Sequence, residues 1–467
     1  MAKQRSVAVD MTTGKPLRLL IMFALPMMLS SIFQQFYNIV DMLVVGNNIG
    51  SNALAAISTS TPVANLFLSA ALGLATGSSV VISQYFGAKQ ISNAKTAIYT
   101  MLTFSFIMGL IMSIIGIVFS RVVLKWINCP AEIFNDAKTY LMIYFSGTIF
   151  IFLYNTLNSS YNALGNSTTP LVFLIISSLL NVVLDILFVM VFHLGVAGAA
   201  TATIISQAVS AVLSFINMRR KLALMENTRE AEVKMFDTGV LKTTMKIAIP
   251  NAIQMLIISL SLVFIQSSIN VFGPAVMAGI SAASRVESLS TMPISNLGNS
   301  FGPFAGQNIG AGRVDRIKEG VKSATMIIVG VGIVLLVVLQ LLAPYLIGIF
   351  VDEADANYAQ MVDVGSRYVR LISCFGIVFG MFMLFMALLR GAGDMKFFLG
   401  ANLTNFAIRV FMALVLAPRF GPQMIWIGTA IGWSAAAIIG FIRYLQGGWK
   451  KKTIIKNPPK TEEAEQA

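Results

Sequence analysis

The feature that most constrains this chain is a series of long apolar runs, each separated from the next by a short polar segment. A helix needs about 20 apolar residues to cross the hydrocarbon core of a bilayer, and these runs have that length. They are continuous and do not alternate between apolar and polar residues, so they predict helices and argue against membrane β-strands. Twelve spans are predicted, at residues 17–45, 53–86, 97–119, 139–160, 170–192, 197–218, 243–271, 275–309, 324–350, 366–389, 397–417 and 424–445.

The composition supports a membrane environment. Hydrophobic residues make up 56% and charged residues 11% of the chain, whereas soluble domains have roughly 45–50% and 25%. A soluble chain of this length has too little polar surface to cover so much apolar surface, and a lipid solvent removes that difficulty. The first run is longer than the apolar core of a signal peptide, so we expect it to remain in the mature protein.

The basic residues lie mainly on one side of the predicted membrane. When the N-terminus is placed in the cytoplasm, most of the 33 Lys and Arg residues fall in inside segments. This excess predicts a multi-pass protein of the cell membrane (inner or plasma) with both termini cytoplasmic. The net charge of +13 is therefore explained by topology, and we expect no nucleic-acid partner.

The chain repeats itself. Ala55-Ala56-Ile57-Ser58 aligns with Ala278-Gly279-Ile280-Ser281, and at the same spacing Gln84 and Gly87 align with Gln307 and Gly310. Each half carries six spans, and an even number returns the chain to its starting side, so both halves have the same orientation. Such halves are related by an axis along the membrane normal, with a cavity between them.

The predicted fold is an all-α integral membrane protein with two pseudo-symmetric six-helix lobes around a central cleft. Its predicted segments are a cytoplasmic N-terminal tail at 1–15, an N-terminal lobe at 16–221, a cytoplasmic linker at 222–239, a C-terminal lobe at 240–446 and a cytoplasmic C-terminal tail at 447–467.

Charged residues inside the predicted spans are the main functional signal, because a charge in the bilayer centre costs about 2.5–3.5 kcal/mol or more. Asp41 ends a polar face that includes Gln34 and Asn38 at helical spacing, and Asp185 ends another that includes Ser178 and Asn181. We expect both acids to lie in the outer half of the membrane and to meet in one hydrated cavity. The other embedded charges are Arg285, Glu287 and Arg409.

The two halves differ at these positions. Asp185 aligns with Arg409, Asn181 aligns with Asn405, and Asp41 has an apolar counterpart near Phe264 or Ile265. The ion chemistry is therefore predicted to be concentrated in the N-terminal half. The sequence contains one histidine, His193, and two isolated cysteines. These offer no cluster for a structural metal or for catalysis, and no phosphate-binding loop is present, so we expect neither an enzyme nor a cofactor.

These features together resemble the multidrug and toxic compound extrusion (MATE) family. The resemblance covers residues 14–446 and depends on the two six-helix lobes, on the phrase Pro26…QQFYNIVD…VG in the first span, and on the repeated Gln84/Gly87 and Gln307/Gly310 pairs. The chain looks most like the DinF-like branch, because that branch has its coupling site in the N-terminal lobe.

The resemblance implies secondary active efflux of bulky, often cationic organic compounds by antiport with H⁺ or Na⁺ and alternating access. It implies a helix bend at Pro26. The implied cation-coupling site consists of Asp41, Asn181, Asp185 and Thr203, which would also be the ligands if the ion is Na⁺. The implied cavity residues are Gln34, Tyr37, Asn38, Tyr140 and Ser178.

A lipid-linked oligosaccharide flippase of the same superfamily fold is the alternative. Such a protein should present several arginines to a pyrophosphate group, whereas only Arg285 and Arg409 are embedded here. The expected partners are small-molecule drugs or toxic organic cations and membrane lipid, and we expect a monomer. The exported compounds, the coupling ion, its stoichiometry and any role of Glu287 or Arg409 in transport stay open.

Overall fold

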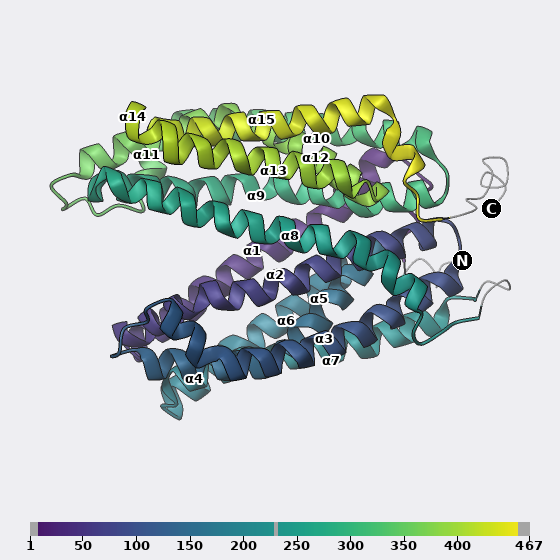
Figure 1. Cartoon of the computed structure of the whole chain (residues 1–467), viewed down its shortest axis with the longest axis horizontal. Helices are drawn as coiled ribbons and strands as arrows, with labels where there is room; N and C mark the ends of the chain where they lie inside the picture. The colour runs from purple at the N-terminus through teal and green to yellow at the C-terminus, as the bar shows by residue number, and fades with distance from the viewer. Residues whose placement is uncertain (1–7, 228–231, 456–467) are drawn as a thin grey trace. The chain divides into compact units, whose positions relative to one another are not determined.

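The computed structural model describes residues 8–227 and 232–455, and every regular element in this part of the chain is helical (Figure 1). Before the linker lie α1 (Pro16–Asn48), α2 (Ser51–Gly87), α3 (Ile91–Trp126), α4 (Phe134–Ser146), α5 (Thr148–Ala163), α6 (Thr168–Asp185), the π-helical η2 (Ile186–Val191) and α7 (Gly195–Leu224). After it lie α8 (Thr238–Ile269), the 3₁₀ turn η3 (Asn270–Phe272), α9 (Pro274–Gly310), α10 (Val314–Gly348), α11 (Tyr358–Cys374), α12 (Gly376–Ala392), α13 (Met395–Phe411), the π-helical η4 (Met412–Leu416), α14 (Ala417–Phe420), α15 (Gln423–Gln446) and the 3₁₀ turn η5 (Gly448–Lys451).

The prediction of an all-helical membrane fold is confirmed. Within the described residues, 9 helices are long and apolar enough to cross a membrane, and the count rises to 11 if each of two bent pairs forms one span. The remaining long helix, α9, has 37 residues but is more polar, since it contains Arg285 and Glu287. These elements correspond to the predicted runs.

Two predicted spans are broken helices. The fourth span consists of α4 and α5, which meet at an angle of 50°, and the tenth consists of α11 and α12, which meet at 53°. The first break lies at Gly147, where an added Cβ would approach the side chain of Ile204 on α7 to 2.2 Å. Glycine therefore allows α7 to pack directly against the bend, and neither break contains a proline that would have signalled it.

The chain forms two compact units. Unit 1 comprises Met1–Asp10 and Leu25–Ala252, and unit 2 comprises Met11–Ala24 and Ile253–Ala467. The chain passes between the units three times: once between Asp10 and Met11, and then inside α1 and inside α8, close to Pro26 and Pro250. Proline removes one backbone hydrogen bond from a helix, so both helix crossings lie near a point where the helix has one bond fewer. The lobe boundaries given in the sequence analysis remain predictions.

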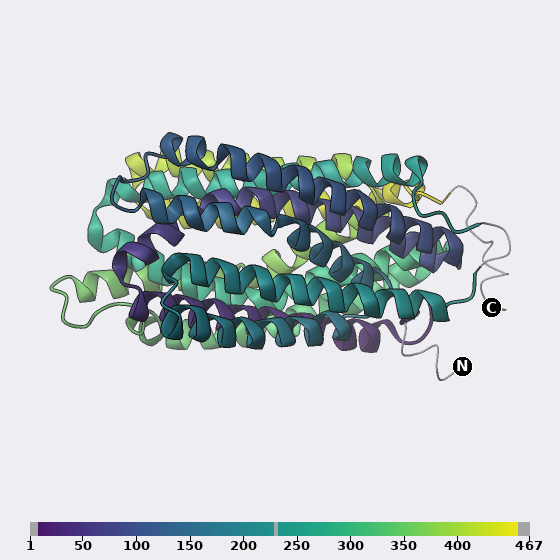
Figure 2. The same ribbon diagram turned by 90° about the horizontal axis from the view of Figure 1, so that it is seen from below.

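In unit 1, α2 packs against α3 and α5, and α6 packs against α7. The helices run along the horizontal axis of Figure 2. Gly73 and Gly77 of α2 face Ala252 and Ala248 of α8, and a Cβ added to either glycine would lie 2.7 Å from the alanine Cβ. Small residues at this spacing let the two backbones approach closely, which fixes the start of α8 on unit 1.

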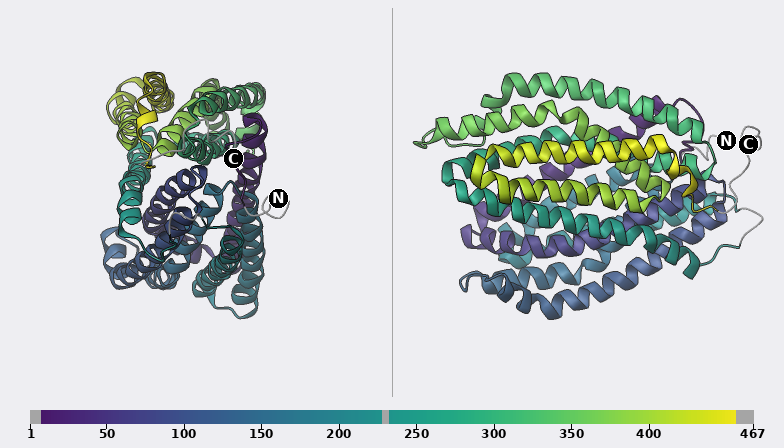
Figure 3. Two further views of the ribbon diagram at one scale, coloured as in Figure 1. Left: turned by 90° about the vertical axis from the view of Figure 1, so that its right-hand side faces the viewer. Right: turned by 45° about the horizontal axis from the view of Figure 1, so that its top comes forward.

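In unit 2, α9 packs against α11 and α12, and α13 packs against α15. Figure 3 (left) views these helices nearly end-on. The rings of Phe379 and Trp433 lie 4.6 Å apart, and an added Cβ on Gly391 would lie 2.7 Å from the Gly302 carbonyl oxygen. The segment before α1 is attached here, because the Met11 backbone N–H donates to Gln307 Oε1 at 2.8 Å.

Asp237 caps the N-terminus of α8. Its Oδ1 accepts a hydrogen bond from the Val240 backbone N–H at 2.9 Å, and its own N–H donates to Thr100 Oγ1 at 3.0 Å. The hydrogen bond from Val240, with smaller contributions from Gly239 and Lys234, holds the pKa of Asp237 below its usual value. A lowered pKa in the folded state means that this cap stabilises the fold above the unfolded-state pKa, and that the stabilisation is lost as the pH falls through the folded-state pKa.

We expect Asp237→Ala to lower the free energy of unfolding by about 1 kcal/mol at neutral pH, a typical value for a lost N-cap. The difference from wild type should shrink as the pH falls below about 4, where aspartate becomes protonated in the unfolded chain. Unfolding of the detergent-solubilised protein at a series of pH values measures this. Asp315→Ala is the control, since Asp315 lies in the first turn of α10, where no side-chain capping bond forms. A constant difference across the pH range would contradict the capping role.

Candidate functional site

The predicted coupling residues come together within unit 1. Asp41 lies on α1, Asp185 is the last residue of α6, and the two carboxyl groups lie close enough to interact directly. Asp185 is fully buried. In the amide orientation that matches donors to acceptors, Asn181 Nδ2 donates to Asp185 Oδ2 at 2.7 Å, and its Oδ1 accepts from the Thr203 backbone N–H at 3.1 Å. Asn181 thereby links α6 to α7 beside the acidic pair.

The local backbone explains this arrangement. Immediately after Asp185, α6 widens into the π-helical turn η2, and such turns are frequent at functional sites. In unit 2 the π-helical turn η4 follows Arg409 by a few residues. Asp185 and Arg409 are the aligned positions of the two halves, so the repeat extends to this unusual backbone. The sequence patterns gave no signal for either π-helical turn.

The Asp41–Asp185 pair can bind one positive charge. Two ionised carboxylates in contact inside a membrane repel strongly, and a hydrogen bond between carboxyl groups requires a proton on one of them. Oδ1 of Asp185 is buried without a hydrogen-bond donor among the described residues. The pair can therefore take up a proton, or a small cation that offers the same charge.

Two tyrosines border the pair. Tyr37 of α1 lies near Thr203 and near both carboxyl groups. Tyr140 of α4 also lies near both, and its ring stacks on Tyr144 with centroids 6.2 Å apart. Both residues were among the predicted cavity residues. Their neutral hydroxyls can orient around a proton or cation without adding charge.

The other predicted cavity residues lie on the same helices. Gln34 and Asn38 are exposed on α1, and Ser178 is half-buried on α6. None of the described hydrogen bonds joins these three to the acidic pair, so their part in substrate contact remains a prediction. Pro26 lies inside α1, which is one continuous helix, and Ser30 Oγ donates to the Pro26 carbonyl oxygen at 2.9 Å. The predicted bend at Pro26 likewise remains a prediction.

The embedded charges of unit 2 separate into two environments. The Tyr368 hydroxyl donates to Glu287 Oε2, and Arg409 lies near enough to interact electrostatically with both. Arg285 instead lies over the ring of Phe350, 5.9 Å from its centroid. Residues two apart on a helix do not face each other, which explains why Arg285 and Glu287 diverge. The sequence analysis missed Tyr368, although the offset that relates Asn181 to Asn405 also relates Tyr144 to Tyr368.

No group of three or more His, Cys, Asp and Glu side chains that could hold a metal occurs in the part of the chain that the structure describes. A Na⁺ ion would need oxygen atoms from Asp41, Asp185, Asn181 and Thr203 together. The Thr203 hydroxyl already donates to the Ala199 carbonyl oxygen at 3.1 Å, and a hydroxyl oxygen that donates keeps lone pairs that can bind a cation. The Na⁺ ligand set remains a prediction.

Comparison with known proteins identifies the family. The family model MatE matches residues 26–187 and 250–415. The "Probable multidrug resistance protein YpnP" of Bacillus subtilis is 30% identical over 95% of this chain and 98% of that protein. An "FAD transporter" of Shewanella oneidensis is 24% identical over 76% of this chain and 78% of that protein.

A solved structure of a MOP superfamily transporter from Pyrococcus furiosus superposes with a TM-score of 0.86, at 23% identity, over 95% of this chain and 99% of that one. This likeness establishes the fold alone. The family model matches both halves of the chain, in agreement with the predicted internal repeat. The chain therefore belongs to the MatE family, whose members are multi-pass membrane transporters and not enzymes.

Proposed function

We propose that this protein is a secondary active multidrug efflux transporter that exports bulky, often cationic organic compounds in exchange for H⁺ or Na⁺. The observation that carries the proposal is the close approach of the Asp41 carboxyl to the buried Asp185 carboxyl, with Asn181 beside them. A membrane protein that keeps two carboxyl groups in contact inside a span gains a place where a cation binds reversibly. The name of the Bacillus subtilis relative supports drugs as the cargo.

The exchange follows from charge. When the acidic pair is ionised, it attracts a cationic compound into the cavity bordered by Tyr37 and Tyr140. When a proton or Na⁺ binds, the pair is neutralised and the compound is released, so the two ligands compete for the same negative charge. Each net charge that moves inward with the membrane potential supplies about 2.3 kcal/mol per 100 mV. A one-for-one exchange of a singly charged compound for H⁺ or Na⁺ moves no net charge, so the concentration gradient of the ion drives it, and the potential contributes when more positive charge enters than leaves.

Alternating access would use the two helix crossings. Pro26 of α1 leaves one helical hydrogen bond unmade, and α1 also carries Asp41. Neutralising Asp41 removes the electrostatic constraint on the outer half of this helix, which then changes its bend at Pro26. We propose this coupling between ion binding and the shape of α1 as the conformational step of transport.

The remaining assignments follow from the same features. We assign the chain to the DinF-like branch, because the acidic pair lies in unit 1 while Glu287 of unit 2 is engaged by Tyr368. The distribution of Lys and Arg supports a location in the cell membrane with both termini and the linker in the cytoplasm. We propose a monomer that requires no cofactor and no nucleic acid.

The flippase alternative fits less well. A pyrophosphate-linked lipid, like the FAD named for the Shewanella relative, carries phosphate charges that favour clustered arginines. Within the described residues, Arg285 lies over Phe350 and Arg409 lies near Glu287. The embedded arginines are therefore separated, and one of them already faces an acid.

Transport by the purified protein in proteoliposomes tests the proposal. A fluorescent organic cation such as ethidium should move in the export direction when a proton gradient or a Na⁺ gradient is imposed, each applied separately. We expect one of the two gradients to drive transport and the other to have little effect. Transport no faster than in protein-free liposomes under both gradients would overturn the proposed function.

A further inference from the structure

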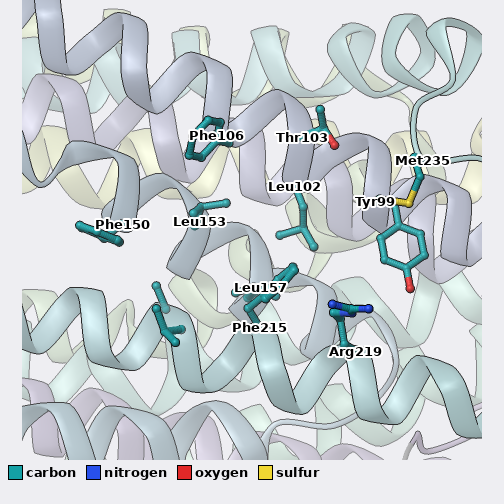
Figure 4. Close-up of a pocket in the computed structure, with 12 residues that line it drawn as sticks. Tyr99, Leu102, Thr103, Phe106, Phe150, Leu153, Leu157, Phe215, Arg219 and Met235 are labelled. Atoms are coloured by element: carbon teal, nitrogen blue, oxygen red, sulfur yellow. The ribbon is translucent and has the colours of Figure 1, made fainter.

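A pocket of about 570 Å³ lies on unit 1, away from the acidic pair (Figure 4). Three helices supply nearly all of its lining, through residues 99–106 of α3, 150–157 of α5 and 211–219 of α7, and Met235 of the linker completes it. Helix α5 packs against both α3 and α7 and forms the wall between them. The volume is in the range of sites that bind small molecules, roughly 300–1,000 Å³.

The pocket has one polar end and a long apolar body. Figure 4 shows Tyr99, Arg219 and Met235 together at one end and Phe106 and Phe150 at the other. These helical windows of eight or nine residues are about 12 Å long. The shape therefore suits a molecule with a small polar head and an apolar chain, and the body offers only apolar side chains besides Thr103.

The charge of the polar end is positive and uncompensated. Among the described residues that line the pocket, Arg219 is the only charged one, and none of the described hydrogen bonds or ion pairs involves it. Its neighbours are engaged: Lys221 Nζ donates to Thr169 Oγ1 at 3.0 Å, and Lys95 Nζ donates to the Met225 carbonyl oxygen at 2.7 Å. Arg219 lies in the last turns of α7, near the end of the span where lipid headgroups lie.

We propose that this pocket binds an anionic phospholipid, with its phosphate at Arg219 and one acyl chain along Phe106 and Phe150. Guanidinium and phosphate form charge-assisted hydrogen bonds, often in a bidentate geometry. A cationic cargo would be repelled by Arg219, so charge complementarity selects the lipid over the compounds proposed for export. The assignment to the cytoplasmic leaflet rests on the topology proposed above, whereas lipid binding itself does not depend on transport.

A lipid bound in this pocket would also contact the linker between the two halves of the chain. The Lys234 backbone N–H donates to Thr96 Oγ1, and the Asp237 N–H donates to Thr100 Oγ1, both at 3.0 Å. These bonds hold the linker on α3 beside the pocket, and Met235 lies between them in sequence and lines the pocket. A bound lipid would add apolar contact to Met235, so it stabilises the attachment of the linker to unit 1.

Lipid binding to the delipidated full chain in detergent tests the proposal. Native mass spectrometry and thermal unfolding would be measured with phosphatidylglycerol and with phosphatidylcholine. We expect the wild type to prefer phosphatidylglycerol about fivefold, since one basic residue near the surface is worth about 1 kcal/mol. Arg219→Gln should abolish this preference. Arg220→Gln is the matched control, because Arg220 is also exposed and does not line the pocket.

A second pair of variants tests the apolar body. Val212 lines the pocket and is 50% exposed, whereas Leu213 is 37% exposed and lies outside it. Val212→Trp should reduce binding of both lipids, and Leu213→Trp should leave binding unchanged.

Three results would overturn the proposal. Equal binding of the two lipids by the wild type would show that the pocket does not recognise the anionic headgroup. An equal loss in Arg219→Gln and Arg220→Gln would indicate a general surface attraction without a pocket. Displacement of phosphatidylglycerol by ethidium would make the pocket a cargo site. None of these measurements requires transport, so they separate this proposal from the proposed function.

Discussion

Asp41→Asn is expected to reduce gradient-driven transport to the level of protein-free liposomes while leaving the protein folded. Asparagine fills the same space as aspartate and can still hydrogen-bond to Asp185, but it cannot bind or release a proton, and it brings no negative charge to a Na⁺ ion. The free energy of unfolding should change by no more than about 1 kcal/mol, because the substitution removes a charge from the half-buried acidic pair without changing volume. Ethidium transport in proteoliposomes and thermal unfolding of the same preparation measure both effects.

Further variants test whether transport depends on the titratable charge of the acidic pair or on the shape of its side chains. Asp185→Asn should lose transport in the same way, since the proton is shared by both carboxyl groups. Asp41→Glu keeps a titratable carboxyl and should retain partial, gradient-dependent transport. Asp363→Asn is the matched control, because Asp363 is an exposed acid of α11 with 52% of its side chain accessible, and it should transport normally. Transport by Asp41→Asn at the wild-type rate under the same gradient would refute the coupling role of the acidic pair.

Much of the fold could be predicted because each membrane-spanning helix can be recognised from its own residues alone. Inside a bilayer, a segment must satisfy its own backbone hydrogen bonds. An apolar run such as 424–445 is therefore predicted to be a helix, and α15 occupies that run. The bends at Gly147 and Phe375 could not be predicted in this way. They depend on which neighbouring helix packs against the break, and a single span carries no information about its neighbours.

The acidic pair was predictable for a related reason. Embedded charges are costly, so Asp41 and Asp185 stand out from apolar spans, and spacing of four residues places Asn181 on the same face as Asp185. Tyr368 does not stand out, because a tyrosine is ordinary in a span, and its contact with Glu287 appears only when α9 and α11 are packed. The lipid pocket was missed because its lining comes from three helices that are distant in sequence.

Two ion pairs of unit 2 differ in burial and should therefore differ in their contribution to the free energy of unfolding. Arg443 Nε of α15 lies 2.7 Å from Asp394 Oδ2, and their side chains are 14% and 2% exposed. The Arg443 guanidinium also lies over the ring of Phe397, 4.0 Å from its centroid. By contrast, Arg367 Nε lies 2.9 Å from Asp363 Oδ1 on α11, with side chains 73% and 52% exposed. The two pairs have similar distances and opposite burial.

Arg443→Ala is expected to lower the free energy of unfolding by about 3–5 kcal/mol, because it leaves the Asp394 carboxylate buried without a partner. Arg367→Ala should cost no more than about 0.5 kcal/mol, the usual worth of an exposed pair four residues apart on a helix. Denaturant unfolding of the purified protein in detergent micelles compares the two. Equal losses in both variants would show that burial does not decide the worth of these pairs.

The double variant Arg443→Leu with Asp394→Asn identifies the source of the loss. If the uncompensated carboxylate causes it, removing both charges should restore much of the stability, because two neutral groups do not carry the desolvation cost of a buried ion. Arg443 and Asp394 lie in unit 2, outside the acidic pair of unit 1. The fraction of the Arg443→Ala variant that folds should therefore still transport in response to a gradient of the coupling ion. A loss of ion dependence in that folded fraction would mean that this pair takes part in transport as well as in stability.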